Sequence, residues 1–132
     1  KLTKLKGLEL GAHATPAALK HLESLPLEYL QLGEGFDSPE SLTIIKDFKS
    51  LKRLTLTNCA KTNDADLTVL ATMRQLESLE LGNLPMTAER AAQLRLFAFL
   101  KTFRLVQRPK PYDADIQAKI KALLPKVELK FQ

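Results

Sequence analysis

Residues 51–81 read LKRLTLTNCAKTNDADLTVLATMRQLESLEL, a stretch that begins and ends with the same apolar pattern, L-x-x-L-x-L. The pattern, with Phe or Val replacing one Leu in the last two copies, occurs six times in the 132-residue chain. Its first positions are 22, 24, 25, 24 and 24 residues apart. A nearly fixed period of this length is typical of solenoids, in which each unit buries its apolar face against its neighbours. The six copies are 5–10, 27–32, 51–56, 76–81, 100–105 and 124–129.

Each copy predicts a β-strand, because its last residues alternate apolar and polar side chains and so bury one face. Between the copies, apolar residues recur every three or four positions, which is typical of a helix with one buried stripe. Because helices are wider than the spacing of strands, we expect an α/β solenoid with a curved parallel sheet on the concave face and helices on the convex face. The expected stripes are Leu19/Leu22/Leu25, Leu42/Ile45/Phe48/Leu51, Leu67/Leu70/Met73/Leu76, Leu94/Phe97/Leu100 and Ile116/Ile120/Leu123.

Polar residues mark the start of each expected helix. Thr15-Pro16 and Ser38-Pro39 combine an N-cap residue with proline at the first helical position. Residues 63–66, 87–89 and 113–115 start the other three helices. Four acids share one phase of the repeat, where the helix dipole favours negative charge. The alternative, a D-x-D calcium or magnesium site, lacks the further oxygen ligands and the glycine of such a loop. The four acids are Glu40, Asp64, Glu89 and Asp113.

Length and composition fit one domain, residues 1–132. With 45% hydrophobic residues the chain can build a core, and no run approaches the roughly 20 apolar residues of a membrane span. The single cysteine, Cys59, excludes an internal disulfide framework. That usage is more typical of the cytoplasm, although bacterial secreted proteins can also lack disulfides.

The net charge of +5 is concentrated at one end of the chain. Residues 1–100 contain 12 Lys or Arg and 12 Asp or Glu, whereas residues 101–132 contain 8 and 3. A basic protein can bind nucleic acid or another acidic surface. Here only the last repeat has that character. Its basic residues are Lys101, Arg104, Arg108, Lys110, Lys119, Lys121, Lys126 and Lys130.

The repeat resembles that of leucine-rich-repeat proteins, and the resemblance covers the whole chain, about five repeats. Residues 51–70 are similar to the cysteine-containing or bacterial subtype, L-x-x-L-x-L-x-x-C/T followed by a T-D-A-G-L helix start. Cys59 stands at the C/T position, and residues 63–67 stand at the helix start and are echoed by 112–116. The resemblance implies binding of macromolecules, chiefly proteins, and brings no catalytic residues. The ninth position departs from the family's Asn or Cys ladder elsewhere, with His13, Gly35, Leu84 and Arg108.

The two ends of the chain differ. Residues 1–5 look like the last turn of a preceding helix and lack the polar cap that a solenoid needs. We therefore expect further repeats or another domain before Lys1, so that the sequence is the C-terminal fragment of a longer protein. Residues 124–131 are expected to form a C-terminal capping strand close to the natural end. Proline and outward charges would protect its edge from pairing, at Pro125, Lys126, Glu128 and Lys130.

The outward residues of the strands are expected to form columns across the sheet. One column alternates in charge and is interpreted as structural: Lys6, Glu28, Lys52, Glu77 and Lys101. A second can pair internally at its end: Glu9, Gln31, Thr55, Glu80, Arg104 and Glu128. The third column is Gly7, Tyr29, Arg53, Ser78, Thr102 and Lys126, and the fourth is Gly11, Gly33, Thr57, Gly82, Val106 and Lys130.

Tyr29 and Arg53 are the expected anchors of a binding surface, because both residue types are favoured at interfaces. The structural alternative is that Tyr29 stacks on Arg53 within the sheet and that the glycines end strands. The sequence leaves both interpretations open. The candidate binding residues on the concave face are Tyr29, Gln31, Arg53, Thr55, Ser78, Glu80 and Arg104.

No catalytic residue, metal or cofactor is expected. His13 and His21 have no partners at ligand spacing for zinc, and Cys59 falls at an inward position, where thiols are usually inert. No phosphate-binding loop or nucleophile motif occurs. The basic stretch 108–111, Arg-Pro-Lys-Pro, is interpreted as a stiff turn before the last helix, with a docking loop as the alternative.

The sequence thus predicts a non-enzymatic protein–protein interaction module that binds an unidentified protein on the concave sheet face. Two alternatives remain. The basic last repeat could bind nucleic acid or another acidic surface. The chain could also be a targeting or regulatory C-terminal part of a larger enzyme.

Overall fold

The chain folds into one parallel sheet of six strands whose order in space follows the sequence, β1-β2-β3-β4-β5-β6. This computed structural model describes residues 5–11, 15–36 and 38–132. The expected helical turn before residue 5 and the position of His13 lie outside those ranges. The strands are β1 Gly7–Leu10, β2 Tyr29–Leu32, β3 Arg53–Leu56, β4 Ser78–Gly82, β5 Thr102–Val106 and β6 Glu128–Phe131.

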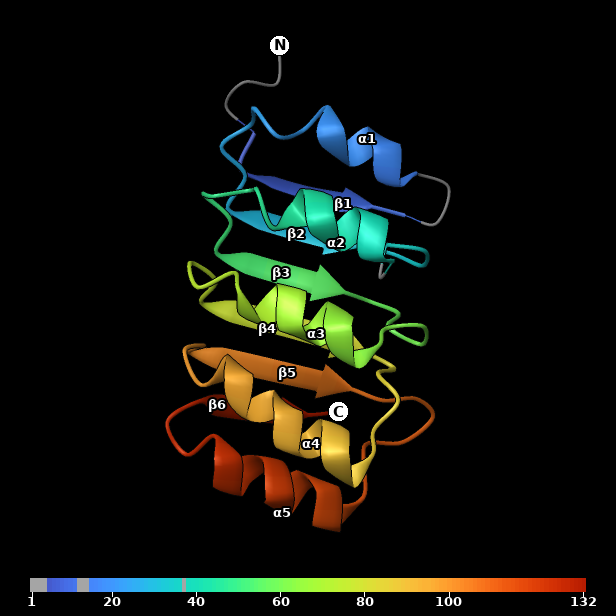
Figure 1. The fold of residues 1–132 in the computed structure, drawn as a ribbon, viewed down its shortest axis with the longest axis vertical. Coiled ribbons are helices and arrows are strands. Elements are labelled where there is room, and N and C mark those ends of the chain that lie inside the picture. Colours follow the sequence, from blue (N-terminus) through green and yellow to red (C-terminus); the bar gives the residue numbers. More distant parts are fainter. Residues whose placement is uncertain (1–4, 12–14, 37) are drawn as a thin grey trace.

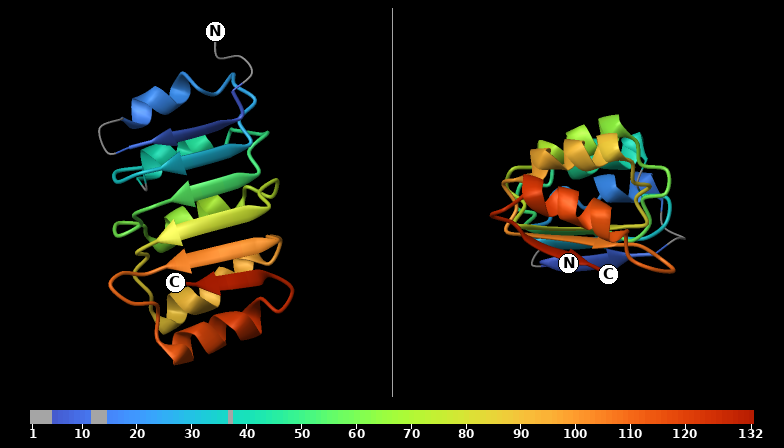
Figure 2. Two further views of the ribbon diagram at one scale, coloured as in Figure 1. Left: turned by 180° about the vertical axis from the view of Figure 1, so that it is seen from behind. Right: turned by 90° about the horizontal axis from the view of Figure 1, so that it is seen from below.

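A helix follows each of the first five strands, and the helices lie on one side of the sheet (Figures 1 and 2). The other face of the sheet is left uncovered by helices, as the view from behind shows (Figure 2). A parallel α/β arrangement was predicted from the repeat and is confirmed. The helices are α1 Pro16–Lys20, α2 Pro39–Ile45, α3 Asp64–Ala71, α4 Ala88–Gln93 with the 3₁₀ segment η1 Leu94–Phe97, and α5 Ala114–Leu123.

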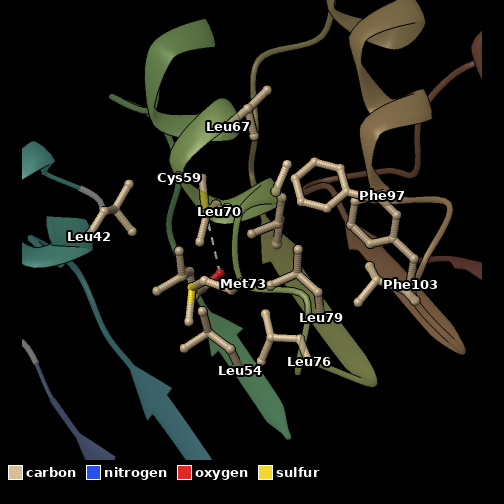
Figure 3. Close-up of a cluster of buried hydrophobic side chains, with 14 of the residues drawn as sticks. Leu42, Leu54, Cys59, Leu67, Leu70, Met73, Leu76, Leu79, Phe97 and Phe103 are labelled. Atoms are coloured by element: carbon tan, nitrogen blue, oxygen red, sulfur yellow. Dashed lines mark hydrogen bonds between the residues drawn. The ribbon is translucent and has the colours of Figure 1, made fainter. Parts of the chain in front are cut away.

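The core lies between the sheet and the helices. Leu54 of β3, Leu79 of β4 and Phe103 of β5 lie side by side in the register of the sheet, and all three are buried. Helical residues such as Leu67 and Phe97 reach them from the other layer (Figure 3). The predicted stripes of α2, α3 and the α4–η1 segment are buried throughout. The stripes of α1 and α5 are only partly buried, because each of these helices has a neighbouring described helix on one side alone.

The predicted helix starts are confirmed, although not every cap makes a side-chain hydrogen bond. Asn63 and Asp66 form a capping box, in which each side chain accepts a hydrogen bond from the other's backbone N–H. The side chains of Ser38 and Thr87 accept hydrogen bonds from the third residue of their helices. Thr15 and Asp113 stand at the N-cap without such a bond. Glu40, Asp64 and Glu89 lie in first turns, where the helix dipole favours them.

The register of the sixth strand differs from the prediction by two residues. Glu128 pairs with Thr102, whereas the repeat pattern had placed Lys126 there. The physical reason is the longer loop before α5: residues 107–113 connect β5 to α5, whereas the shorter stretch 83–87 connects β4 to α4, and the helical segments 88–97 and 114–123 are equally long. Val127 is buried before the strand begins, and Leu129 and Phe131 take the inward strand positions opposite Phe103 and Leu105. The predicted capping strand 124–131 is thus confirmed only for its second half.

The loops after the strands complete the core in different ways. Cys59 and Leu84 fill the ninth position of their repeats and are fully buried. Gly35 stands at that position with φ 93°, a conformation that glycine adopts readily, and the next residue, Phe36, is buried instead. In the last loop Arg108 stands at the ninth position and is exposed, and Tyr112 fills the core instead. The Tyr112 hydroxyl donates a hydrogen bond to the carbonyl oxygen of Leu84.

Burial raises the pKa of Tyr112 from its ordinary value of 10.0 to about 12, and the neighbouring Cys59 adds to that effect. The folded protein therefore keeps the phenol protonated at pH values where the unfolded chain ionises it. The resulting stabilisation is fully present below pH 10 and is lost as the pH rises towards 12.

Tyr112→Phe should remove this pH dependence. At neutral pH the variant should be less stable by about 1–3 kcal/mol, because the buried Leu84 carbonyl loses its donor. Above pH 10 the difference between the two proteins should shrink, because only the wild type loses the stabilisation described above. Urea unfolding at several pH values measures this difference, and a difference that stays constant from neutral pH to above pH 11 would contradict the assignment.

Within the described ranges, no helix combines the length and the apolar composition that a transmembrane span requires.

Candidate functional site

The alternating column at the start of the strands forms two of the predicted cross-strand ion pairs. Lys6 binds Glu28 with an N–O distance of 2.9 Å, and Lys101 binds Glu77 at 3.2 Å. The pKa of Glu28 is lowered, first by the hydrogen bond and charge of Lys6 and then by the charges of Lys52 and Arg53. Lys52 stands between the two pairs, and no described residue accepts a hydrogen bond from its ammonium group. This column contributes to the stability of the sheet by cross-strand attraction.

The seven candidate binding residues come together on the helix-free face of the sheet. Neighbouring strands place Tyr29 beside Arg53, Arg53 beside Ser78, and Glu80 beside Arg104. All seven line one depression of about 400 Å³, together with two residues that had not been singled out as candidates. Its lining is Tyr29, Gln31, Arg53, Leu54, Thr55, Ser78, Glu80, Thr102 and Arg104.

One end of the depression is formed by an aromatic and a cationic side chain. The guanidinium carbon of Arg53 lies 4.9 Å from the centre of the Tyr29 ring, a cation–π distance. The Tyr29 hydroxyl donates a hydrogen bond of 2.7 Å to Oε1 of Gln31, two residues along the same strand face. The contact between Tyr29 and Arg53 that the structural alternative predicted is therefore present. Arg53 is nevertheless exposed, and no described residue accepts a hydrogen bond from its guanidinium.

The other end is formed by an ion pair. Nη1 of Arg104 lies 3.3 Å from Oε1 of Glu80, as predicted, and both side chains are half-buried. The predicted third member, Glu128, is not there, because the shifted register places Lys130 beside Arg104. Glu128 instead lies 4.0 Å from Lys130 on its own strand. The shift also displaces Lys126 from the third column and Lys130 from the fourth, where Gln132 approaches the end of β5.

Gly82 has a structural function at the edge of this face. A Cβ atom at this position would lie 2.2 Å from the carbonyl oxygen of Thr57, so the two strands approach more closely than a side chain allows. The carbonyl of Gly82 also accepts a hydrogen bond from the N–H of Cys59. Gly11, at the same repeat position, has free space around the corresponding point. The structural alternative, in which the glycines only end strands, is therefore incomplete for Gly82.

The other candidates of the sequence lie apart from the depression. Cys59 is buried, as predicted, and its thiol donates a hydrogen bond to the carbonyl of Leu56 (Figure 3). His21 is exposed at the end of α1. Among the described residues, no group of three or more His, Cys, Asp or Glu side chains could hold a metal ion.

The loop 107–113 forms a second hollow, of about 310 Å³, between β5 and α5. Its lining includes Pro109, Lys110 and Pro111 of the loop together with Met86 and Ile116. The buried Tyr112 ties the loop to the carbonyl of Leu84, which favours the interpretation of this stretch as a fixed turn.

The basic residues of the last repeat are spread over both layers. Lys101 and Arg104 lie on or beside the sheet and are bound to glutamates. Lys119 and Lys121 belong to α5, in the helical layer, and the ammonium group of Lys121 lies 5.8 Å from the centre of the Phe131 ring.

Two lining residues were not in the candidate set: Leu54, whose side chain is buried, and Thr102, although the predicted third column contained Thr102. Thr102 pairs with Ser78, so a set built on whole columns would have included it. Comparison of the chain with protein-family models, with curated proteins and with solved structures found no match.

Proposed function

We propose that the chain is a leucine-rich-repeat solenoid with a concave sheet, and that it serves as a non-enzymatic module that binds a protein on this sheet face. The observation that carries the proposal is the single depression lined by all seven candidate residues, which come from four adjacent strands. The parallel order and constant register of β1 to β5 give the outward residues the regular columns that such a surface needs.

The character of the lining supports a protein partner. Pockets for small molecules are mostly lined by apolar and aromatic side chains. In this depression only Leu54 is aliphatic, and the other eight lining residues have polar groups in their side chains. Tyr29 and Arg53 belong to the residue types that most often anchor protein interfaces. The two side chains are in contact. Arg53 is exposed, so it is accessible to a partner.

Binding of nucleic acid through the last repeat is the less supported alternative. That function needs a continuous cationic surface. The described basic residues of the repeat are divided between the sheet and α5, and three of them, Lys101, Arg104 and Lys130, form ion pairs with glutamates. A regulatory function within a larger enzyme would use the same sheet face, so it concerns the longer protein and not the chemistry of this surface.

Affinity capture from a source lysate at physiological salt tests the proposed function. The wild-type domain should retain a protein that the Tyr29→Ala/Arg53→Glu double variant does not retain, because the double variant removes the aromatic anchor and inverts the charge beside it. Both substitutions are on the uncovered face, so circular dichroism should show an unchanged fold. A matched control is Lys119→Glu, which inverts a charge on α5 and should capture the same protein as the wild type.

Retention of the same proteins by the wild type and the double variant would contradict the sheet-face site. Capture of nucleic acid by all variants, lost at higher salt, would assign the function to the basic last repeat.

A further inference from the structure

Three carboxylates around the centre of the sheet face already have cationic partners, whereas Glu9 on the outer strand β1 is exposed and has none among the described residues. Glu28 is bound by Lys6, Glu77 by Lys101, and Glu80 by Arg104. In the described part of the chain, each of these pairs joins two adjacent strands and brings together one positive and one negative charge. A partner that approached this region would therefore meet neutral pairs at β1–β2 and β4–β5, and one further carboxylate, Glu9, at the outer strand β1.

Two cations at β3 have no such partner. Lys52 and Arg53 are consecutive and exposed, and no described carboxylate lies within ion-pair distance of either side chain. The guanidinium of Arg53 lies over the ring of Tyr29, and its N–H donors have no acceptor among the described residues. Arginine in this state presents several donors in a planar arrangement that matches a carboxylate.

The rest of the depression adds hydrogen-bond donors beside Arg53. Thr55, Ser78 and Thr102 are half-buried, and no described residue forms a hydrogen bond with their hydroxyl groups. The depression holds one carboxylate, that of Glu80, and Arg104 binds it. An acidic side chain would thus meet donors and an unpaired positive charge, whereas a basic side chain would meet Arg53 and Arg104.

We propose that the protein partner presents an acidic segment to this depression, and that Arg53 binds an Asp or Glu carboxylate of that segment with help from the neighbouring hydroxyl groups. This inference rests on the proposed function, since it specifies the chemistry of the same surface. Charge-assisted hydrogen bonds between a guanidinium and a carboxylate are stronger than neutral ones. Lys52 adds a second positive charge next to the anchor and increases the attraction at longer range.

Nuclear magnetic resonance of the ¹⁵N-labelled domain tests the inference with defined probes. Two synthetic peptides of equal length, one of alternating Ser and Glu and one of alternating Ser and Gln, are titrated at physiological ionic strength. The acidic peptide should shift amide signals of β3, β4 and β5, and the neutral peptide should not. Arg53→Gln should weaken binding of the acidic peptide by about tenfold, since a charged hydrogen bond is lost.

The control Lys119→Gln removes one positive charge from α5 and should bind the acidic peptide as the wild type does. Equal shifts by the acidic and neutral peptides would overturn the acidic specificity and leave the sheet face as a binding surface. Shifts confined to α5, or equal affinity of Arg53→Gln and wild type, would overturn the proposed anchor. The absence of shifts with both peptides would overturn the inference, while the capture experiment decides separately whether the face binds a protein. A single-stranded oligonucleotide that shifts the same signals more strongly than the acidic peptide would also overturn it.

Discussion

Leu79→Ala is expected to lower the free energy of unfolding by about 2–5 kcal/mol. Leu79 lies in β4, between Leu54 of β3 and Phe103 of β5, and its side chain is completely buried. Truncation removes three carbon atoms from a position where both neighbours are fixed by the sheet, so the cavity cannot close easily. Chemical denaturation of both proteins at neutral pH measures the difference.

The matched control is Leu96→Ala in η1. Leu96 is the one large hydrophobic residue among the described residues that is exposed. Its loss should change the stability by about 0.5 kcal/mol or less. Equal stability of Leu79→Ala and wild type would show that Leu79 does not face the core. The register of β3, β4 and β5 would then be wrong, and with it the placement of every outward residue.

Gly82→Ala is expected to destabilise the protein by about 1–3 kcal/mol or more, in the range of substitutions that force the backbone to move. The added methyl group would lie 2.2 Å from the carbonyl oxygen of Thr57 and 2.8 Å from its carbon. A backbone group cannot rotate away as a flexible side chain does. The shift would also disturb the hydrogen bond from the N–H of Cys59 to the Gly82 carbonyl.

Gly11→Ala provides the control at the same repeat position, because no contact from the described residues lies within 4 Å of the added atom. That variant should be as stable as the wild type, or slightly more stable through the restricted unfolded chain. Equal effects of the two substitutions would mean that β3 and β4 do not approach as closely at Gly82 as described.

The sequence predicted the middle of the sheet well, and the reason is physical. In β2, β3, β4 and β5 the leucines of each copy must all face one core, so a slip of one residue would turn them towards solvent. The outward columns then follow from the register, and the pairs Lys6–Glu28 and Glu80–Arg104 were predicted in this way.

The prediction failed where the apolar pattern had two solutions. In the last unit, Leu124, Val127 and Leu129 match the repeat, but Val127, Leu129 and Phe131 also alternate. The loop 107–113 before α5 is longer than the corresponding loop 83–87 before α4, which makes the second solution possible, and the repeat pattern alone does not specify the length of that loop. Tyr112 was missed for a related reason, since it fills the core from a position four residues beyond the one that the repeat assigns.

The sequence predicted which residues of the candidate site lie next to one another, but it did not predict all of the hydrogen bonds and ion pairs between them. Strand register brings Tyr29, Arg53 and Ser78 into one row. Which cations have partners depends on side-chain conformations, so the unpaired state of Lys52 and Arg53 could only be seen in the structure. The close approach at Gly82 also required coordinates, because Gly11 has the same place in the repeat and no such contact.

The central claim, that a protein binds on the helix-free face of the sheet, is tested most directly by the place of contact in the captured complex. A photo-crosslinking amino acid is introduced at Thr55, in the depression, or at the exposed Ala118 of α5 as the control. The account predicts a cross-linked partner from position 55 and none from position 118. Cross-linking from position 118 alone would place the binding surface on the helices and contradict the account.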